Sequence, residues 1–384
     1  MRRLVAANVV LGEPLKFAIY DERGNLLLRK GFVVTMPDQV ERLLLRKALI
    51  ADSDLVAEPS PRVSPAAASA PRGPVAEMEP VFESMNGLVL NLKHALATAL
   101  ATPEQIDLPE RIAKLASTIQ TFCQQDLDGT LAAAGLDFRN PYIVVHQVMG
   151  AVLTELITAR KGMPVEQRRS LVCAALTRDF GQLPMQGELE KLTTPLSETM
   201  REQLNAHPEL GLKMLERAGV DDPVWLEAIH AHHERLDGSG YPRGLSGDAM
   251  PFGGRVLAVT DAYSAMSKPR AYRVKAYNPQ QALRELYLSA GTLMDGELTQ
   301  LLVREIGMLP PGTIVRLKCG EIAVIKSPTQ LATSARAYSV YGKAGTVLGA
   351  PVLRDTSLPE FEITGMVPYS ECRSAAVTIK RVWL

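Results

Sequence analysis

The most informative stretch of this sequence is HHERLDGSGYP, at residues 232–242. It joins two adjacent histidines, His232 and His233, to a glycine-rich turn, and ordinary core packing requires neither feature. Adjacent imidazoles can both ligate a metal ion if the backbone turns both rings inward. The glycines that follow end the preceding helix, because glycine adopts backbone conformations that other residues avoid. The stretch therefore predicts a metal site at a helix end, with further ligands elsewhere in the chain.

The composition indicates an ordinary globular protein. The chain has 384 residues, enough for two or three domains, and is 46% hydrophobic and 22% charged. Its formal net charge of +0 disfavours a generally basic nucleic-acid binder, so we expect no DNA or RNA partner. Its four cysteines are widely separated and form no CxxC pair, which disfavours a disulfide framework and a zinc ribbon.

Targeting signals are not evident in the sequence. No uninterrupted apolar run approaches the roughly 18 residues that a membrane helix needs. The start, MRRLVAANVVLG, continues into the next segment without a convincing cleavage site. We therefore expect a cytoplasmic protein without a signal peptide or a transmembrane segment.

The order of patterns along the chain predicts five segments. Residues 1–57 have the pattern of a small α+β module, and residues 58–78 form a Pro/Ala/Ser-rich linker. Residues 79–134 carry two leading helices, residues 135–305 continue as a helical domain, and residues 306–384 form a small β-rich module. The expected fold class is mainly α, with a helical bundle between two small modules.

Two hairpins are expected, one in each terminal module. In the first, apolar residues 16–20 and 26–28 flank the polar turn DERGN at residues 21–25. In the second, residues 313–318 and 321–325 flank a Cys-Gly pair. Both patterns predict antiparallel strands.

Three helices are expected before the central domain. The first is capped by Thr35 within the N-terminal module. The next two could extend the core of the central domain or pack against a second chain, which leaves a homodimer open. Their apolar positions, at helical spacing, are Met85, Leu88, Leu92, Leu96 and Leu100, then Leu108, Ile112, Leu115, Ile119 and Phe122.

Further candidate ligands are scattered through the central domain. His146 lies in a predicted helix, Asp179 follows Arg178, His207 precedes a proline, and Asp261 ends an apolar run. A helical bundle can gather such residues from different helices into one cavity. The two remaining histidines, at positions 94 and 230, are interpreted as ordinary surface or helical residues.

At these residues the chain resembles the HD-GYP family, bacterial cyclic di-GMP phosphodiesterases that form a branch of the HD metal-dependent phosphohydrolases. The resemblance covers roughly residues 135–305 and depends on the spacing of the histidines and on the long GYP segment. It also depends on a TD-x-Y motif followed by R-x-YR. It implies an all-α HD-GYP bundle in residues 135–305, between the α+β module and the β-rich module, and a role in cyclic di-GMP signal transduction.

The resemblance also implies a metal centre. Asp179 would bridge two neighbouring ions and act in catalysis, and the donor types suit Fe or Mn. Two such cations can polarise phosphoryl oxygens and activate water for in-line attack on a phosphodiester. Arg270 and Arg273 match positions that clamp phosphate, for which the planar guanidinium fork is suited. The implied ligands are His146, Asp179, His207, His232, His233 and Asp261.

The motif loop has a separate implied role. Its residues read as loop-shaping or partner-contacting groups rather than catalysts. The resemblance implies that such a loop recruits signalling proteins, including diguanylate cyclases. The loop residues are Asp237, Gly238, Gly240, Tyr241 and Pro242.

The chain departs from the family pattern at four positions. Arg178 stands where the family has the name-giving histidine, and a guanidinium cannot ligate a metal ion because it offers only donors. Gln182 replaces a phosphate-contacting lysine, Ser264 stands at a common aspartate position, and Tyr142 makes a third metal unsupported. Arg178 could act as a surrogate cation or turn outward with a shift of the helix. We therefore expect one ion, with two as the alternative.

Three functions remain open on the sequence. The leading hypothesis is a cyclic di-GMP signalling protein with a degenerate site that binds nucleotide or a partner and is impaired in hydrolysis. The second is an active metal-dependent phosphodiesterase that produces pGpG or GMP. The third is a protein-docking scaffold with a vestigial site.

Overall fold

The computed structural model describes most of the chain from residue 80 onward and short stretches before it. The described residues are 2–4, 8–9, 15, 17–20, 26–28, 49–50 and 80–384, apart from 193, 195, 268–277 and 329–334. The chain divides into two compact units, Met1–Ala76 and Glu77–Leu384.

The first unit contains a four-stranded sheet. Its strands lie in the order β1-β4-β2-β3, with β2 antiparallel to β3, so the predicted hairpin is confirmed. The helix expected after Thr35 and the linker at residues 58–78 lie outside the described residues. The strand bounds are β1 (Arg2–Arg3), β2 (Ile19–Tyr20), β3 (Leu26–Leu28) and β4 (Leu49–Ile50).

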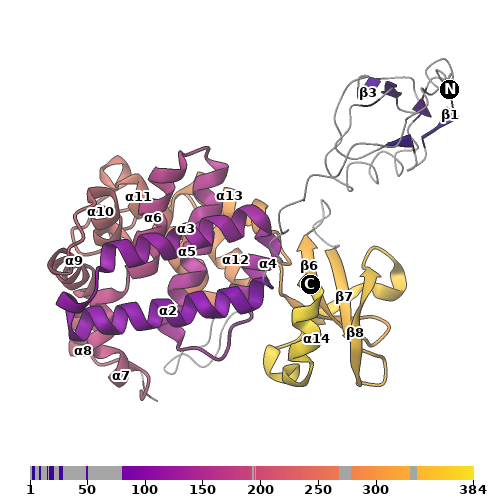
Figure 1. The fold of residues 1–384 in the computed structure, drawn as a ribbon. Coiled ribbons are helices and arrows are strands. Elements are labelled where there is room, and N and C mark those ends of the chain that lie inside the picture. Colours follow the sequence, from indigo (N-terminus) through magenta and orange to yellow (C-terminus); the bar gives the residue numbers. More distant parts are fainter. Residues whose placement is uncertain are drawn as a thin grey trace, which may run out of the picture. The chain divides into compact units, whose positions relative to one another are not determined.

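The second unit is a helical bundle followed by a β-sheet module (Figure 1). The mainly α fold class is therefore confirmed. The helices of the bundle are α2 (Val81–Ala101), α3 (Leu108–Gln125), α4 (Leu127–Gly135), α5 (Tyr142–Arg160), α6 (Val165–Thr177), α7 (Gln186–Leu189), α8 (Glu198–Asn205), α9 (His207–Arg217), α10 (Pro223–Ala231), α11 (Phe252–Ser267), α12 (Pro279–Leu288) and α13 (Gly296–Ile306).

Helix α5 is the centre of this bundle. It packs against α2, α3, α4, α6, α11 and α13, and nearly all of its residues are buried. By length and composition α5 could cross a membrane, but 89% of its most apolar window is buried inside the protein. A helix containing His146 was predicted, but no apolar run of membrane length, because His146, Gln147 and Thr154 interrupt the apolar residues. Its composition is explained by its central position.

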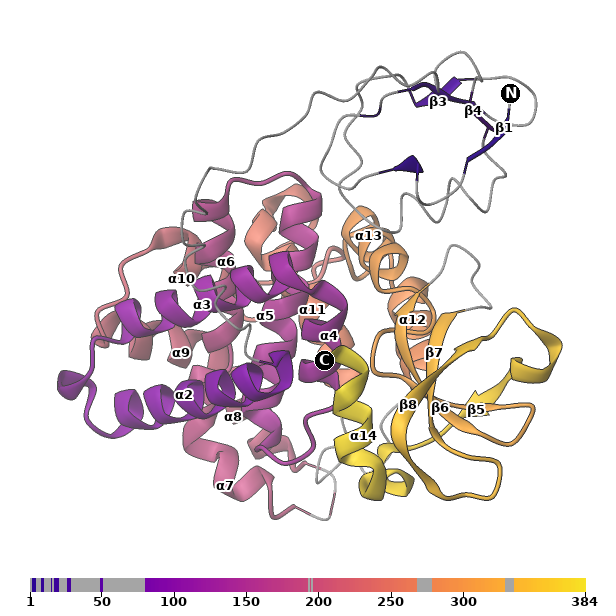
Figure 2. The same cartoon turned by 45° about the vertical axis from the view of Figure 1, so that its right-hand side comes forward.

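The two leading helices extend the core of the bundle. Helices α2 and α3 lie along one side of α5, and their apolar residues join the same hydrophobic cluster (Figure 2). The first of the two interpretations above is thus confirmed. Two positions differ from the predicted pattern, because Leu100 is 40% exposed and Phe122 is only half-buried. Leu100 is the second-to-last residue of α2, at the end of the helix.

The C-terminal module is a five-stranded antiparallel sheet in the order β8-β7-β6-β5-β9. Strand β5 pairs with β6, which confirms the second predicted hairpin. The strands are β5 (Ile314–Leu317), β6 (Ile322–Pro328), β7 (Ala335–Tyr341), β8 (Val347–Asp355) and β9 (Ile363–Met366).

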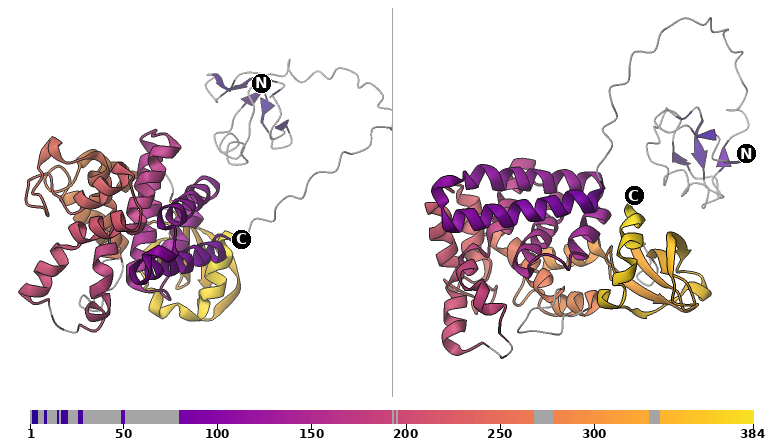
Figure 3. Two further views of the ribbon diagram at one scale, coloured as in Figure 1. Left: turned by 60° about the vertical axis from the view of Figure 1, so that its left-hand side comes forward. Right: turned by 60° about the horizontal axis from the view of Figure 1, so that its bottom comes forward.

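The sheet module packs directly against the bundle. It lies at one end of the helices, with α14 (Ala376–Lys380) between sheet and bundle (Figures 2 and 3). The Trp383 ring lies 5.5 Å from the Phe82 ring of α2, centroid to centroid, and Lys380 Nζ is 3.4 Å from Glu83 Oε1. Apolar residues of both parts form one continuous core, so the module and bundle share their stability.

A pH dependence of stability follows from Asp128 in the first turn of α4. Burial raises the pKa of this carboxyl from 3.8 to about 6, the neighbouring Asp126 adds to the shift, and Lys326 opposes it. Because the pKa is higher in the folded state, ionisation of Asp128 opposes folding, and stability is lost as pH rises through this window. We expect Asp128→Asn to raise Tm by about 2–4 °C at pH 8, a modest value because solvent screens a partly buried group.

Thermal unfolding between pH 4.5 and 8 measures this effect. The gain should shrink toward pH 4.5, where the wild-type carboxyl is protonated in the folded state. Glu198→Gln, at an exposed position in the first turn of α8, is the control and should show no such trend. A gain that does not change with pH would contradict the assignment.

Candidate metal centre

The bundle brings all six predicted ligand residues together from five places in the chain. His146 comes from α5, Asp179 follows α6, and His207 begins α9. The two adjacent histidines follow α10, and Asp261 lies within α11. Their donor atoms form two groups, within each of which all atoms lie within 4.8 Å of one another. The groups are His207, His232, His233 and His146, Asp179, Asp261.

The three-histidine group presents two nitrogen lone pairs to one another. The Nδ1 atoms of His207 and His232 lie 2.6 and 2.5 Å from the backbone oxygens of Leu204 and Ile229. A carbonyl only accepts, so each Nδ1 carries the hydrogen and each Nε2 is an acceptor. These two Nε2 atoms are 3.2 Å apart, which is repulsive unless a cation or a proton lies between them. A carbonyl on the far nitrogen is also the usual support of a metal-binding imidazole.

A metal ion fits this group better than a proton does. Burial and, to a smaller extent, the neighbouring His207 lower the pKa of His232 to about 4. Burial and His232 likewise hold the pKa of His233 well below its ordinary value. At neutral pH these rings are therefore uncharged, with lone pairs available for a divalent ion.

Asp179 lies between the two groups. Its Oδ1 is 3.8 Å from His207 Nε2 and its Oδ2 is 3.7 Å from His146 Nε2. Burial alone would raise the pKa of this carboxyl, but Arg178 and His146 outweigh burial and lower it. The Oδ2 atom is buried without a hydrogen-bond partner among the described residues. This oxygen also lies 3.6 Å from Arg178 Nε, at ion-pair distance. An ionised carboxylate suits such a position beside a cation.

Arg178 turns inward and fills the second group with positive charge. Its side chain is 0% exposed, and its Nε donates to Asp261 Oδ1 at 2.9 Å. The alternative that Arg178 turns outward is wrong. Burial would raise the pKa of Asp261, yet Arg178 and His146 hold it well below its ordinary range.

His146 belongs to this arginine-filled group in its chemistry as well as its position. Its Nε2 lies 2.9 Å from the same Asp261 oxygen and, beside an ionised carboxylate, acts as a donor. Its remaining Nδ1 lone pair is buried without a partner among the described residues. Burial and Arg178 lower the pKa of His146, so the ring is neutral. In the arginine-filled group, the charge of Asp261 is thus balanced by Arg178, and most hydrogen bonds are made within the group.

Glu234 anchors the motif loop, a role that the sequence analysis missed. Its carboxylate is fully buried, with Oε1 accepting from the Arg243 backbone N–H at 2.7 Å and Oε2 from the Leu245 backbone N–H at 2.9 Å. Glu234 directly follows the paired histidines in the quoted motif, which was the signal available. It therefore links the metal-binding end of the loop to its far side.

The remaining loop residues shape the turn. Asp237 Oδ1 accepts from the backbone N–H and the hydroxyl of Ser239, and Gly238 has a φ of 81°. A Cβ on Gly240 would lie 2.6 Å from the Glu234 carbonyl carbon, so only glycine fits there. The Tyr241 ring lies 4.8 Å from the His233 ring, and its bond to Pro242 is cis.

The other predicted residues have more varied placements. Gln182 lies in the turn after Asp179, and its side-chain amide donates to Gln186 at 3.3 Å. Tyr142 stacks on His146 with ring centroids 5.2 Å apart. Arg270 and Arg273 lie outside the described residues, so their part in phosphate binding stays a prediction. The two histidines interpreted as ordinary, at positions 94 and 230, lie on α2 and α10 and belong to neither group.

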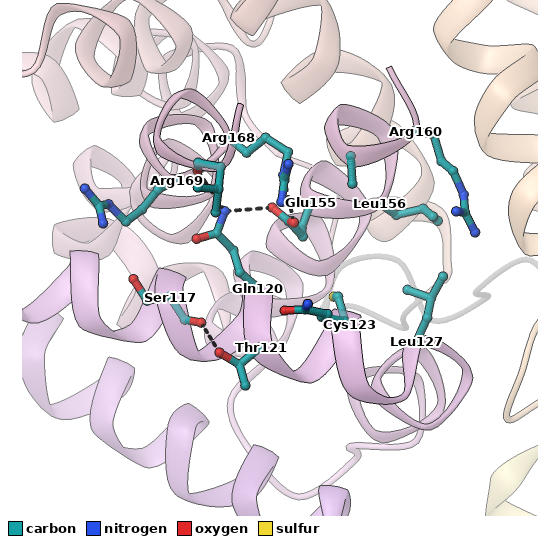
Figure 4. Close-up of a pocket in the computed structure, with 13 residues that line it drawn as sticks. Ser117, Gln120, Thr121, Cys123, Leu127, Glu155, Leu156, Arg160, Arg168 and Arg169 are labelled. Carbon is teal, nitrogen blue, oxygen red and sulfur yellow. Dashed lines mark hydrogen bonds and ion pairs between the residues drawn. The ribbon is translucent and has the colours of Figure 1, made fainter. Parts of the chain in front are cut away.

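A pocket of about 750 Å³ lies toward the C-terminal end of α5, among α3, α5 and α6 (Figure 4). At its base, Glu155 accepts from Gln120 Nε2 at 3.1 Å and from Arg168 Nε at 2.9 Å. The pocket is lined by none of the six ligand residues. Its buried charge is paired within the protein, so we interpret this cluster as structural.

Comparison with known proteins agrees with this geometry. Residues 136–298 match the family described as HD domain. The cyclic di-GMP phosphodiesterase PA4108 of Pseudomonas aeruginosa is 28% identical over 231 residues, covering 56% of this chain and 54% of that protein. The response regulator RpfG of Xanthomonas campestris, also a cyclic di-GMP phosphodiesterase, is 32% identical over 151 residues, covering 39% of each. The family model and these relatives support the HD-GYP family for the helical domain.

The match to solved structures supports the fold. Bd1817, an HDG"Y"P protein from Bdellovibrio bacteriovorus, aligns with a TM-score of 0.50 at 15% identity, covering 78% of this chain and 97% of that one. The chain spans about half or less of the length of the curated relatives it matches. An HD domain is metal-dependent as a family property, and the two groups described above are the candidate positions in this HD-GYP domain.

The anchoring role of Glu234 in the HD-GYP loop generates a prediction. Glu234→Ala removes the charged acceptor of two part-buried backbone N–H groups, and a hydrogen bond to a charged group is worth about 1.5–3 kcal/mol. We expect a loss of at least about 2 kcal/mol in the free energy of unfolding. We also expect faster hydrogen exchange at the amides of Arg243 and Leu245.

Glu227→Ala is the matched control. Glu227 pairs with Arg243 Nη2 at 2.9 Å, but it is 45% exposed, and such a pair contributes about 0–1 kcal/mol. It should leave exchange at the two amides nearly unchanged. Equal effects of the two variants would show that the loop does not depend on the buried carboxylate.

Proposed function

We propose that this HD-GYP domain binds one divalent metal ion and a cyclic dinucleotide, cyclic di-GMP, and is impaired in hydrolysing it. The observation that supports this most is the unequal chemistry of the two halves of the centre. One half presents facing imidazole lone pairs that need a cation. The other half already contains the cation of Arg178.

The ion would be held by His207, His232, His233 and Asp179. When bound, it would supply charge that stabilises a phosphate oxygen. The donor set of three imidazoles and one carboxylate suits Fe or Mn. Asp179 would keep its second oxygen turned toward the arginine-filled half.

Impaired hydrolysis follows from what the arginine-filled half lacks. The guanidinium of Arg178 already donates to Asp261, to two backbone carbonyls and to the hydroxyl of Ser264. It therefore cannot move to stabilise negative charge that develops on a phosphate. Gln182, at the position of a family lysine, is neutral. Losing two such electrostatic groups removes transition-state stabilisation while leaving ground-state contacts in place.

The choice of ligand is supported by the curated relatives. Several are named cyclic di-GMP phosphodiesterases, and three from Vibrio cholerae are named for 3'3'-cGAMP. Arg270 and Arg273 would hold the phosphates of such a ligand. An active phosphodiesterase is the second candidate, because the three-histidine group and Asp179 are all present.

Metal content distinguishes the two halves. We expect one Mn²⁺ per chain, with a mononuclear Mn²⁺ signal in electron paramagnetic resonance. His207→Ala should weaken binding by about 10–100-fold or more, since it removes one of few ligands. His146→Ala is the matched variant in the arginine-filled half and should retain one ion. Two ions in the wild-type protein, or loss of the ion in His146→Ala, would overturn the one-ion proposal.

Hydrolysis of cyclic di-GMP is the decisive activity test. The wild-type protein, supplied with Mn²⁺ or Fe²⁺ under anaerobic reducing conditions, should bind the dinucleotide and form little pGpG. Arg178→His combined with Gln182→Lys should raise the rate by about 100-fold or more, the usual effect of one electrostatic group. Turnover by the wild-type protein that is abolished in His233→Ala would establish an enzyme instead. Absence of both binding and turnover would favour a docking scaffold.

A further inference from the structure

Gly150 is an unusual residue for its place in the bundle. It lies inside α5, one turn after His146, in a helix buried along nearly all of its length. Glycine inside a helix costs about 0.5–1 kcal/mol relative to alanine. It also leaves unfilled the space that a buried side chain would occupy. The presence of glycine at this position therefore needs a physical explanation.

The guanidinium of Arg178 occupies that space. A Cβ built on Gly150 would lie 2.9 Å from Arg178 Cζ and 3.0 Å from Nη2, and closer still to Nη1. Separations of this kind are steric overlaps. A guanidinium at the surface could move aside, but this one is fully buried and therefore cannot swing into solvent.

Hydrogen bonds from three helices hold the guanidinium in place. Nη1 donates to the Ala175 backbone oxygen of α6 at 2.8 Å, and Nη2 to the His146 backbone oxygen of α5 at 3.1 Å. Nη2 also lies 3.4 Å from the hydroxyl of Ser264 on α11, and Nε donates to Asp261. All three guanidinium nitrogens thus have acceptors.

The absence of a side chain at position 150 makes one of these acceptors, the His146 backbone oxygen, accessible to Arg178. A helical side chain covers the turn that precedes its own Cα. The carbonyl of His146 belongs to that turn, four residues before Gly150. Without a Cβ at position 150, the guanidinium can approach this carbonyl from the side and share it with the helix.

We infer that Gly150 is the positioning residue for Arg178, and that the two form a matched pair which makes a guanidinium site in place of a metal position. Gly150 provides the space and the exposed carbonyl, and Arg178 provides the charge. The pair holds Asp261 and His146 in place without an ion. Its consequence for metal number rests on the proposed one-ion centre, whereas the pairing itself rests on the contacts alone.

A double-mutant cycle tests the pairing. With Arg178 present, Gly150→Ala should lower Tm by several degrees or prevent folding, because the new methyl group overlaps the guanidinium. With Arg178→Ala, which removes the overlapping group, Gly150→Ala should be neutral or stabilising, as expected from helix propensity. The Arg178→His background with Mn²⁺ should give the same recovery.

Gly87→Ala is the control for helix propensity. Gly87 lies inside α2, and a Cβ there would have no atom within 4 Å beyond its own helix and chain neighbours among the described residues. Its substitution should raise Tm in every background. If Gly150→Ala behaves like Gly87→Ala with Arg178 present, the inference is wrong. It is also wrong if Gly150→Ala is equally costly in all backgrounds.

Metal counting separates this inference from the proposed function. Two ions in the wild-type protein would overturn the one-ion centre and leave a positive double-mutant cycle standing. One ion in the wild-type protein, together with no coupling between positions 150 and 178, would support the one-ion centre and overturn the pairing. Recovery of folding by the double variants also covers the case in which Gly150→Ala alone does not fold.

Discussion

The buried guanidinium of Arg178 is the constraint on which the centre of the bundle depends. A cation without solvent is costly unless its charge and all its donors are matched. Here Asp261 supplies the opposite charge, and acceptors on α5, α6 and α11 satisfy the donors. Three helices are therefore held at the distances that one planar group requires. Replacing Asp261 by an apolar residue would leave this buried charge without its counter-ion.

The two halves of the centre solve the same electrostatic problem differently. Each buries acidic or lone-pair groups that repel one another without a cation. In the arginine-filled group the cation is covalently part of the chain, so this half is complete when the protein folds. In the three-histidine group the facing nitrogens have no such internal cation among the described residues. Asp179 faces both halves, and its charge couples them.

The local patterns of the sequence predicted the hairpins and the leading helices, and they identified six residues that the bundle brings together. Periodicity was sufficient for α2, α3 and both hairpins, because their apolar faces repeat at fixed spacing. The quoted motif was sufficient to direct attention to the six ligand positions. The direction of Arg178 could not be predicted, because it depends on a glycine 28 residues away that belongs to a different helix. The anchoring by Glu234 was hidden for the same reason, since its partners are backbone groups that face it only after the loop closes.

Under the proposed function, a centre built in this way would favour binding over turnover. Hydrolysis of a phosphodiester requires groups whose interaction strengthens as charge develops on the phosphate. A guanidinium whose donors are already used by buried acceptors has little left to offer to a transition state, and a shift toward the ligand would break four contacts at once. The same contacts hold the carboxylate of Asp261 and the backbone of His146 in one arrangement. Arg178, the residue that departs most from the family pattern, would thus give the site a rigidity that is useful for recognising a ligand.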